Sequence, residues 1–294
     1  MPFDLRQSRL AHLRACQNSD GGWGYFPKKQ SRLEPTCYAL LALHGDKPST
    51  EAWMRGWSLI RSWQQEDGGF RPGAEIHLSS WATALVVTLH CVHGVSDSRF
   101  QKGVSWLLGS KGVEGGWLER ALGLIMKMPV EYDRRHKGWP WLADTSSWVE
   151  PTAHSLLALK KAASQVSLPN LQQRVIEGER MMLDRRSPDG GWNYGNRRVL
   201  RTDLPSYPET TAVALLGLQG SLLMEDRNGA VAAAEKHLLE TKSRLAKAWL
   251  TISLRNYGRD VTLSAAETAP EDLMIAALEA LACPNGGHQW LKPA

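Results

Sequence analysis

The sequence of 294 residues lacks the marks of several protein classes. It has no apolar run of transmembrane length, and its first residues, MPFDLRQSRLAHLRA, form a charged amphipathic stretch without the apolar core of a signal peptide. Its four cysteines, Cys16, Cys37, Cys91 and Cys283, are widely spaced and include no Cys-x-x-Cys pair. These absences predict a protein of a reducing, cytoplasmic setting.

Other absences concern chemistry and partners. The phosphate-loop and dinucleotide-binding glycine patterns are missing, and nothing indicates a Ser/His/Asp triad. The net charge of +5 is too small to indicate a nucleic-acid partner. No segment alternates apolar and polar residues as a strand does, so we expect an essentially all-α chain. In contrast, there are 13 tryptophans, and so large a side chain is costly unless it packs or binds something.

Two short patterns recur along the chain. The first is an acidic residue, two glycines and an aromatic residue, at 20–23, 67–70, 114–117 and 189–192, with a weaker NGGHQW at 285–290. Successive second glycines are 47, 47, 75 and 96 residues apart, and 96 is twice 48. A unit of about 48 residues therefore repeats along the chain, and six units would account for nearly all of it.

The second pattern, Glu-x-Thr-x-x-[Ala/Ser]-Leu-Leu-x-Leu, occurs at 34–43, 150–159 and 209–218. These segments are apolar nearly all round, which predicts fully buried helices, whereas segments such as 51–65 are amphipathic. Alternating buried and half-exposed helices favour two concentric rings. The sequence thus predicts one all-α domain over residues 1–294, an (α/α)6 toroid of about twelve helices. The expected inner helices lie near 34–45, 79–93, 148–161, 208–220 and 244–256.

The repeats carry further expectations. We expect left-handed backbone at the turns among Gly22, Gly69, Gly116 and Gly191, because each turn ends a helix and reverses the chain. We expect Trp23, Trp117 and Trp192 to be buried between hairpins. About 30 extra residues follow the third turn, with a short helix near 119–128. No inner helix is expected after NGGHQW.

The glycine–aromatic turns resemble the QW repeats of squalene–hopene and oxidosqualene cyclases, in which a Gln precedes a Gly-x-Trp turn. Gln17 before Gly21-Gly22-Trp23 fits this pattern, and Gln65 before Gly68-Gly69-Phe70 nearly fits. The resemblance covers nearly the whole chain and implies an α-toroid of the prenyltransferase/squalene oxidase repeat type, which protein prenyltransferase β subunits share. It implies a single-domain terpene cyclase-like protein that binds an isoprenoid or an isoprenyl diphosphate.

The resemblance also implies candidate catalytic residues. Cyclases that protonate an alkene or epoxide carry Asp-x-Asp-Asp-Thr-Ala at the mouth of an inner helix, and Tyr207-Pro208-Glu209-Thr210-Thr211-Ala212 is the matching stretch. Glu209 takes the place of the proton-donating Asp, and Glu34 and Glu150 take it in their repeats, but the flanking aspartates are missing. The Asp-x-Cys zinc pair of prenyltransferases occurs nowhere. The rival interpretation is a non-catalytic toroid that binds a lipid or a peptide after losing the acid motif.

Because the inner helices run parallel, Glu34, Glu150 and Glu209 should meet at one rim, with raised pKa values if the carboxylates crowd one another. The alternative is that each glutamate only balances the positive end of its helix. Basic loops lead to the same rim, and their arginines would hold a diphosphate or another anion unless they are merely solvated. These candidates are Arg134, Arg135, Arg197, Arg198 and Arg201.

Aromatic residues on or beside the inner helices are the other candidate substrate contacts, through apolar walls and cation–π contacts, the alternative being packing between helices. They are Tyr38, Trp81, Trp148, Tyr207 and Trp249, together with His154. No metal site is expected: His90-Cys91-x-His93 should end an inner helix at the rim opposite Glu34. No cofactor is expected unless a diphosphate substrate brings Mg²⁺. The expected partner is a small isoprenoid or lipid, with peripheral membrane contact, and no nucleic acid.

Overall fold

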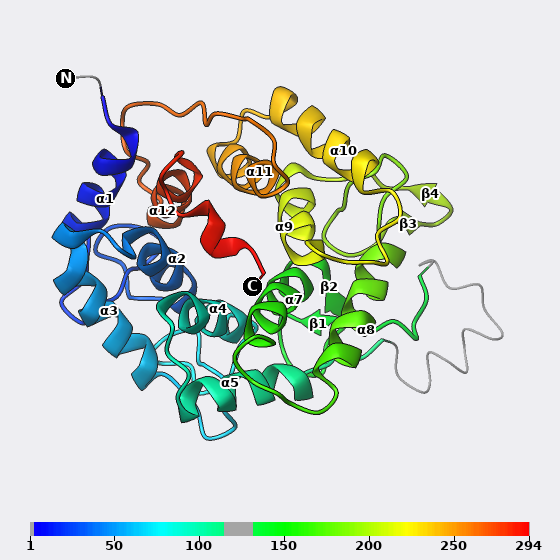
Figure 1. The fold of residues 1–294 in the computed structure, drawn as a ribbon, viewed down its shortest axis with the longest axis horizontal. Coiled ribbons are helices and arrows are strands. Elements are labelled where there is room, and N and C mark those ends of the chain that lie inside the picture. The colour runs from blue at the N-terminus through cyan, green and yellow to red at the C-terminus, as the bar shows by residue number, and fades with distance from the viewer. Residues whose placement is uncertain (1–2, 115–131, 294) are drawn as a thin grey trace.

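The structure, a computed structural model, describes residues 3–114 and 132–293, and its helices form two concentric rings (Figure 1). Within these residues the inner ring contains α2 (Leu33–Leu43), α4 (Thr83–His93), α7 (Val149–Ala162), α9 (Pro208–Leu218), α11 (Arg244–Asn256) and α12 (Leu273–Ala282). The outer ring contains α1 (Leu5–Ala15), α3 (Thr50–Ser62), α5 (Ser98–Gly109), α8 (Leu171–Asp184) and α10 (Arg227–Glu240). Each inner helix packs against the next, and α12 packs against α2. The closed ring confirms the predicted toroid.

The described strands are short and lie in two antiparallel hairpins. They are β1 (Trp139–Pro140) with β2 (Ser147–Trp148), and β3 (Arg198–Val199) with β4 (Thr202–Asp203). Two 3₁₀ turns, η1 (Lys47–Ser49) and η2 (His288–Leu291), complete the described elements. These strands and turns are short segments that connect or follow the helices, as the all-α prediction requires.

The inner helices form where the sequence is apolar on every side. In α2 every residue except Glu34 is buried. In the outer helix α3 only Trp53, Gly56 and Ile60 are buried, a stripe with helical spacing. The five inner helices predicted from the sequence are confirmed. The sixth, α12, was not predicted, and the segment 258–272 before it contains no outer helix.

A threonine near the start of an inner helix fastens each turn to that helix. The Oγ1 atom of Thr36 accepts a hydrogen bond of 3.0 Å from the backbone N–H of Trp23, and the indole N–H of Trp23 donates to Leu13 O on α1 at 2.8 Å. The same backbone bond joins Phe70 to Thr83, Trp139 to Thr152 and Trp192 to Thr211. Trp23 and Trp192 are fully buried, which confirms their predicted packing.

The two glycines of a turn have different tasks, and the prediction named the wrong one. Positive φ falls on the first glycine, with Gly21 at 95°, Gly68 at 92° and Gly190 at 96°, and not on the second. The second glycine needs space instead, since a Cβ on Gly22 would lie 2.6 Å from the hydroxyl oxygen of Ser31. Gly116 lies outside the described residues.

The third turn is divided in two. Glu114 accepts a bond of 2.8 Å from the N–H of Ser147, while Trp139 supplies the buried aromatic ring, with its indole N–H on Leu107 O of α5. Trp139 therefore makes, in the third repeat, the contacts that Trp23 makes in the first. Trp117 itself and the helix expected near 119–128 lie outside the described residues.

A glutamine amide joins neighbouring units in the first two repeats. The Nε2 of Gln17 donates to Gly21 O at 2.8 Å and to Ala52 O on α3 at 2.7 Å. In the second repeat Gln64, and not the predicted Gln65, makes the equivalent bonds, to Gly68 O and Arg99 O. The offset follows from the spacing, because Gln17 and Gln64 each precede the first glycine of the turn by four residues.

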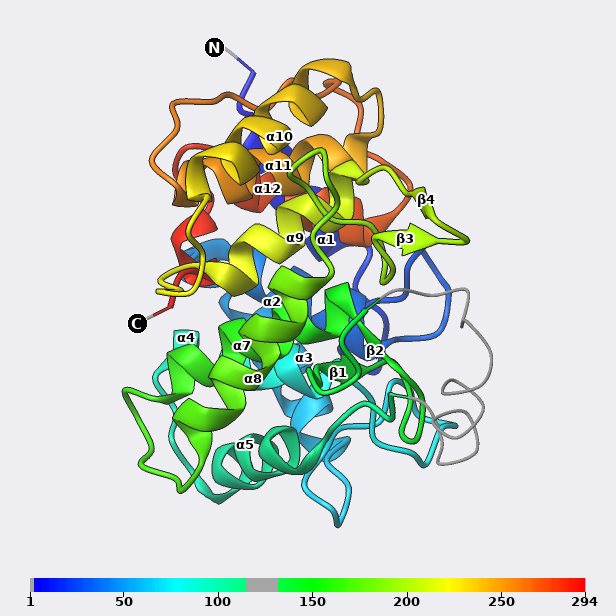
Figure 2. The same ribbon diagram turned by 90° about the vertical axis from the view of Figure 1, so that its right-hand side faces the viewer.

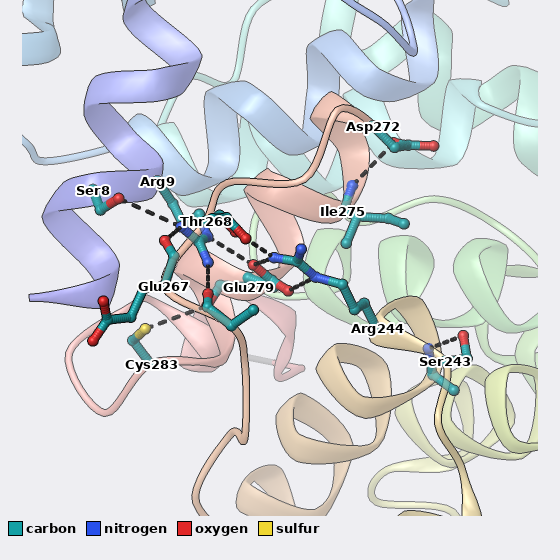
Figure 3. A network of polar contacts seen from close by, with 12 residues as sticks. Ser8, Arg9, Ser243, Arg244, Glu267, Thr268, Asp272, Ile275, Glu279 and Cys283 are labelled. Atoms are coloured by element: carbon teal, nitrogen blue, oxygen red, sulfur yellow. Dashed lines mark hydrogen bonds and ion pairs between the residues drawn. The ribbon is translucent and has the colours of Figure 1, made fainter.

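The ring is closed by a buried ionic cluster at the position of the absent outer helix (Figure 3). Arg9 on α1 donates to one oxygen of Glu279 on α12 at 2.7 Å, and Arg244 on α11 donates to both oxygens of the same carboxylate. Arg9 also donates to the carbonyls of Ala266 and Glu267. The first and last helices and the segment 258–272 are thereby joined around Glu279.

The C-terminal segment crosses the middle of the ring on the face where the inner helices end (Figures 1 and 2). Leu291 is fully buried, and its carbonyl accepts a bond of 2.8 Å from Gln219 after α9. The ring of Trp290 lies 5.2 Å from that of His44, which follows α2. The segment therefore covers this end of the ring, and the opposite end carries the loops that lead into the inner helices.

Candidate functional site

The three repeated glutamates are brought together at the N-terminal ends of the inner helices. Glu150 on α7 lies close enough to Glu34 on α2 and to Glu209 on α9 for the charges of both to raise its pKa. Asp272, which caps α12, acts on Glu34. Parallel helices that carry acid at the same repeat position thus place it at one mouth, as predicted. Glu34, Glu150, Glu209 and Asp272 are called the acid rim below.

The environment of Glu34 and Glu150 favours the protonated form of both carboxyls. Burial, followed by the charges of Glu34 and then Glu209, raises the pKa of Glu150 to about 8. Burial also raises the pKa of Glu34, and the nearby Asp272 adds to this, while a hydrogen bond from Tyr25 acts in the opposite direction. The carboxyl of Glu150 therefore retains its proton at neutral pH.

Below the acid rim, aromatic side chains from alternate inner helices meet on the axis. Tyr38 on α2 lies one helical turn after Glu34, and His154 on α7 lies one turn after Glu150; the Tyr38 hydroxyl is 3.3 Å from His154 Nε2. The ring of Trp249 on α11 lies 5.4 Å from Tyr38 and 5.9 Å from His154. Burial lowers the pKa of His154 to about 3, so this imidazole is neutral.

Trp81, just before α4, completes this group at 5.5 Å from the ring of His154. Tyr38, Trp81, His154 and Trp249 are called the aromatic floor below. They were expected to line an open cavity, but their rings pack on one another, with 0%, 2% and 3% exposure for Tyr38, His154 and Trp249. The axis of the toroid is therefore filled at the level of the aromatic floor, because the rings of Tyr38, His154 and Trp249 meet there from alternate inner helices.

Trp148 and Tyr207 are not part of the floor. Each is the N-cap of its helix, α7 and α9, and each remains partly exposed, at 37% and 42%. Tyr207 stacks at 5.3 Å with Tyr194, another exposed ring. These residues therefore flank the mouth, one layer outside the floor.

The structure adds residues that the sequence pattern did not single out. Tyr25 donates to Glu34 Oε2 at 2.5 Å, Ser243 donates to Glu209 Oε1 at 3.2 Å, and Trp141 packs on Trp81 at 4.8 Å. A signal for some of them existed in the repeat. Tyr25, Trp141 and Tyr194 each follow the buried Trp of their turn by two residues.

Backbone bonds explain why that position reaches the mouth. The first N–H of α12, at Leu273, donates to Tyr25 O at 2.8 Å, and that of α7, at Val149, donates to Tyr194 O at 2.9 Å. A loop residue of one repeat is thus tied to the inner helix of the preceding one. The side chain that it carries is held at the edge of the acid rim.

The predicted basic residues do not face the acid rim in this way. Arg135 pairs with Asp133 at 2.7 Å and lines a surface groove on the outer helix α8 with Gln173 and Arg180. Arg198 pairs with Asp203 within the β3–β4 hairpin, which projects at the periphery of the ring (Figure 1). Arg197 and Arg201 flank the same hairpin and are exposed, and Arg134 lies beside Tyr132, a ring that stacks on Arg185. The contacts of Arg135 and Arg198 are thus made within their own loops, and the anion-binding collar expected from these loops stays a prediction.

Among the residues that the structure describes, no three His, Cys, Asp or Glu side chains form a group suited to a metal ion. His90 and His93 lie at the C-terminal end of α4 and pack on Trp57, away from the acid rim. In the same described ranges no helix is long and apolar enough to span a membrane.

Comparisons with known proteins support the fold. No family model and no curated protein matches the sequence. Among solved structures, the apo type II terpene cyclase MstE from Scytonema is 20% identical, with 95% of this chain and 76% of that chain covered and a TM-score of 0.56. The ent-copalyl diphosphate synthase from Streptomyces platensis is 17% identical, with 93% and 45% covered and a TM-score of 0.50.

A third neighbour has a different chemistry. The α-1,6-mannanase GH76A of Salegentibacter sp. HEL1_6, in complex with α-1,6-mannotriose, is 10% identical, covers 95% and 98% of the two chains and has a TM-score of 0.60. Because one architecture holds both terpene and sugar substrates, function depends on the side chains of the site. The chain has the α/α-toroid fold of the terpene cyclases.

Proposed function

We propose that this protein is terpene cyclase-like: it binds an isoprenoid with its apolar end against the aromatic floor and cyclises it after proton transfer from Glu150. The observation that carries this proposal is the setting of Glu150. Its carboxyl lies between Glu34 and Glu209, one helical turn from His154 of the floor, and its pKa is about 8. A proton donor therefore stands next to an apolar aromatic surface at neutral pH.

The reaction is an isomerisation or a hydration. The proton of Glu150 goes to one carbon of the terminal double bond, whose π electrons form the new C–H bond and leave a cation on the other carbon. The next double bond attacks that cation and closes a ring. Loss of a proton to the Glu150 carboxylate gives a hydrocarbon and restores the acid, whereas capture by water gives an alcohol and releases a proton.

The surroundings favour the cation that forms. The faces of Trp81, Trp249 and Tyr38 carry negative charge density and stabilise a carbocation through cation–π contacts. The negative charge left on Glu150 after proton transfer acts in the same direction. A raised pKa keeps the proton on Glu150 at neutral pH but makes the carboxyl a weaker acid. Stabilisation of the carbocation is therefore an essential part of the proposal.

The position of Glu150 makes it the preferred donor over Glu209, which the sequence motif favoured. Glu150 lies between the other two glutamates and has His154 one turn below it, whereas Glu209 is bonded to Ser243 at the edge. Glu34 and Glu209 then serve as its charged neighbours. The terpene cyclase MstE, whose structure contains geranylgeranyl dihydroxybenzoate as substrate, supports a prenyl chain as the ligand.

The test is incubation of the purified protein with squalene and C15–C20 prenyl substrates, followed by mass spectrometry of the extracted products. A new cyclic hydrocarbon or alcohol is expected from the native protein. Glu150→Gln keeps the shape of the side chain and removes its acidic proton, so it should abolish the product without unfolding the protein. Glu240→Gln, on the exposed end of α10, is the matched control. Undiminished product from Glu150→Gln would refute the assignment of the acid.

A second candidate function is non-catalytic binding of a lipid or isoprenoid. Two observations favour it: the aspartates flanking the acid in the cyclase motif are missing, and the floor rings pack closely on the axis. In this case the protein would purify with an unchanged lipid and form no new product. The same mass spectrometry separates the two functions.

Contact with a membrane surface belongs to this proposal. Large apolar side chains are exposed on the loops that lead into α2, α4, α7 and α9, and they include Phe26, Leu78, Leu142 and Leu200. A collar of this kind would let an apolar substrate reach the mouth without crossing water. Flotation with liposomes tests this, and a quadruple serine variant should float less.

A further inference from the structure

We infer that the mouth selects a prenyl chain with an uncharged head, such as a prenyl alcohol or a hydrocarbon, and rejects the corresponding prenyl diphosphate. This inference rests on the proposed isoprenoid site and decides between two substrate classes that the fold leaves open. It follows from the charges around the acid rim and from where the nearby cations are engaged.

Most of the ionisable groups that act on the acid rim are acids and phenols, and the imidazole of His237 on α10 interacts with the charge of Glu209. Glu150 has two carboxylate neighbours, Glu34 and Glu209, and Asp272 acts on Glu34. The phenols of Tyr25, Tyr38 and Tyr194 face the same carboxylates. Among the described residues no cation is hydrogen-bonded or ion-paired to Glu34, Glu150 or Glu209.

Three arginines near the loops of the mouth are engaged elsewhere, whereas Lys28 and Lys29, on the loop before α2, are exposed. Arg244 opens α11, but both oxygens of Glu279 hold its guanidinium. Arg32, the N-cap of α2, pairs with Glu75 at 3.1 Å. Arg135 is paired with Asp133 on the outer side. A diphosphate at the mouth would therefore meet carboxylates without gaining these ion pairs.

The consequence for binding is a penalty that depends on the head group. A diphosphate carries at least two negative charges, and each would repel the ionised members of the acid rim. A hydroxyl head group has no such penalty and can donate to Glu209 or to the hydroxyl oxygens of Tyr25 and Ser243, whose own O–H groups donate to Glu34 and Glu209. At equal chain length we expect the alcohol to bind about tenfold more tightly, or better, at low ionic strength.

The experiment measures binding and does not depend on turnover. Geranylgeraniol and geranylgeranyl diphosphate have the same chain, and their dissociation constants are obtained by equilibrium dialysis at low and high salt. The alcohol should bind more tightly. The gap should narrow at high salt, because screening weakens the repulsion of the diphosphate alone.

Variants provide a second readout. Glu209→Gln removes an acidic group while keeping the size of the side chain and one acceptor oxygen, so it should tighten diphosphate binding several-fold and change alcohol binding much less. Glu240→Gln, at the exposed end of α10, should change neither. A tightening that appears for both ligands would indicate a change of shape and would contradict the electrostatic origin.

The outcomes separate this inference from the function on which it rests. Binding of the alcohol with weak, salt-sensitive binding of the diphosphate supports it. Equal or tighter binding of the diphosphate overturns the inference and leaves the isoprenoid site standing. Failure of both ligands to bind overturns the proposed function, and this inference with it.

Discussion

The phenol of Tyr25 donates a hydrogen bond of 2.5 Å to Oε2 of Glu34, and thereby joins a partly exposed loop residue to the acid rim. The backbone of Tyr25 is fixed at the same time, because its carbonyl accepts the first N–H of α12. A hydrogen bond to a carboxylate favours its ionised form. Tyr25 therefore opposes the burial that raises the pKa of Glu34.

Replacement of Tyr25 by Phe should raise the pKa of Glu34. The variant keeps the ring but removes the donor, so the carboxylate loses a partner that its protonated form needs less. The pKa is measured by NMR titration of protein carrying ¹³C-labelled glutamate. Tyr194→Phe is the control, since the Tyr194 phenol lies near Glu209 and Glu150. An equal shift of Glu34 in both variants would show that the Tyr25 bond is not the cause.

The contribution of Glu150 to the stability of the native protein should fall as pH rises from about 4.5 to about 8, whereas buried His154, whose pKa is lowered from 6.5 to about 3, acts in the opposite direction below about pH 6.5. An ordinary glutamate carboxyl has a pKa of 4.5, whereas the pKa of Glu150 in the folded protein is about 8. Between these two pH values the folded state therefore holds a proton that the unfolded state has lost. One such proton lowers the free energy of unfolding by at most roughly 1.4 kcal/mol per pH unit. Denaturant titrations at pH 5 and pH 8 measure this difference. Glu150→Gln should flatten it, and an unchanged slope would contradict the raised pKa.

Thr152→Val should lower the free energy of unfolding by about 1–3 kcal/mol. The substitution leaves the buried N–H of Trp139, 2.9 Å from the lost oxygen, without its acceptor. Thr251→Val is the matched control on another inner helix, because the buried hydroxyl of Thr251 has no hydrogen-bond partner among the described residues. It should be neutral or slightly stabilising. If urea denaturation shows a larger loss of stability for Thr251→Val than for Thr152→Val, the hydrogen bond between Trp139 and Thr152 is not a stabilising contact.

Glu279→Ala should lower the free energy of unfolding by about 3–5 kcal/mol, because it removes one partner of a buried ion pair. The substitution leaves the guanidinium of Arg9, fully buried, without its carboxylate partner. Glu240→Ala removes an exposed pair with Lys236 at 4.0 Å and should cost less than about 0.5 kcal/mol. Thermal and chemical denaturation measure both. If Glu279→Ala lost as little stability as Glu240→Ala, apolar packing alone would close the ring.

Gly21→Ala should cost clearly more than Gly45→Ala, although both glycines have positive φ, at 95° and 77°. The left-handed backbone alone costs about 1–2 kcal/mol for a residue with a Cβ. A Cβ at Gly21 would also lie 2.9 Å from the backbone of Arg55, whereas nothing lies within 4 Å at Gly45. Comparison of the two melting temperatures isolates the contact. Equal losses would show that the backbone at Arg55 shifts freely.

Much of the architecture is local information and could be read from the sequence. The apolar residues on every side of α2 and α9 require burial, and a 48-residue repeat of such helices can be buried only by neighbours on both sides. Glutamate at the same position of parallel helices places Glu34, Glu150 and Glu209 at one mouth. Each of these arguments needs only spacing, periodicity and the direction of a helix.

The rest depended on contacts between distant parts of the chain. Trp139 bonds to Thr152 in the third turn as Trp23 bonds to Thr36 in the first, and α12 closes the ring through Arg9, 270 residues away. The charged side chains that act on Glu150 come from other repeats. A pKa depends on burial and on neighbouring charges in space, so only the tertiary structure could distinguish Glu150 from the other glutamates of the repeat.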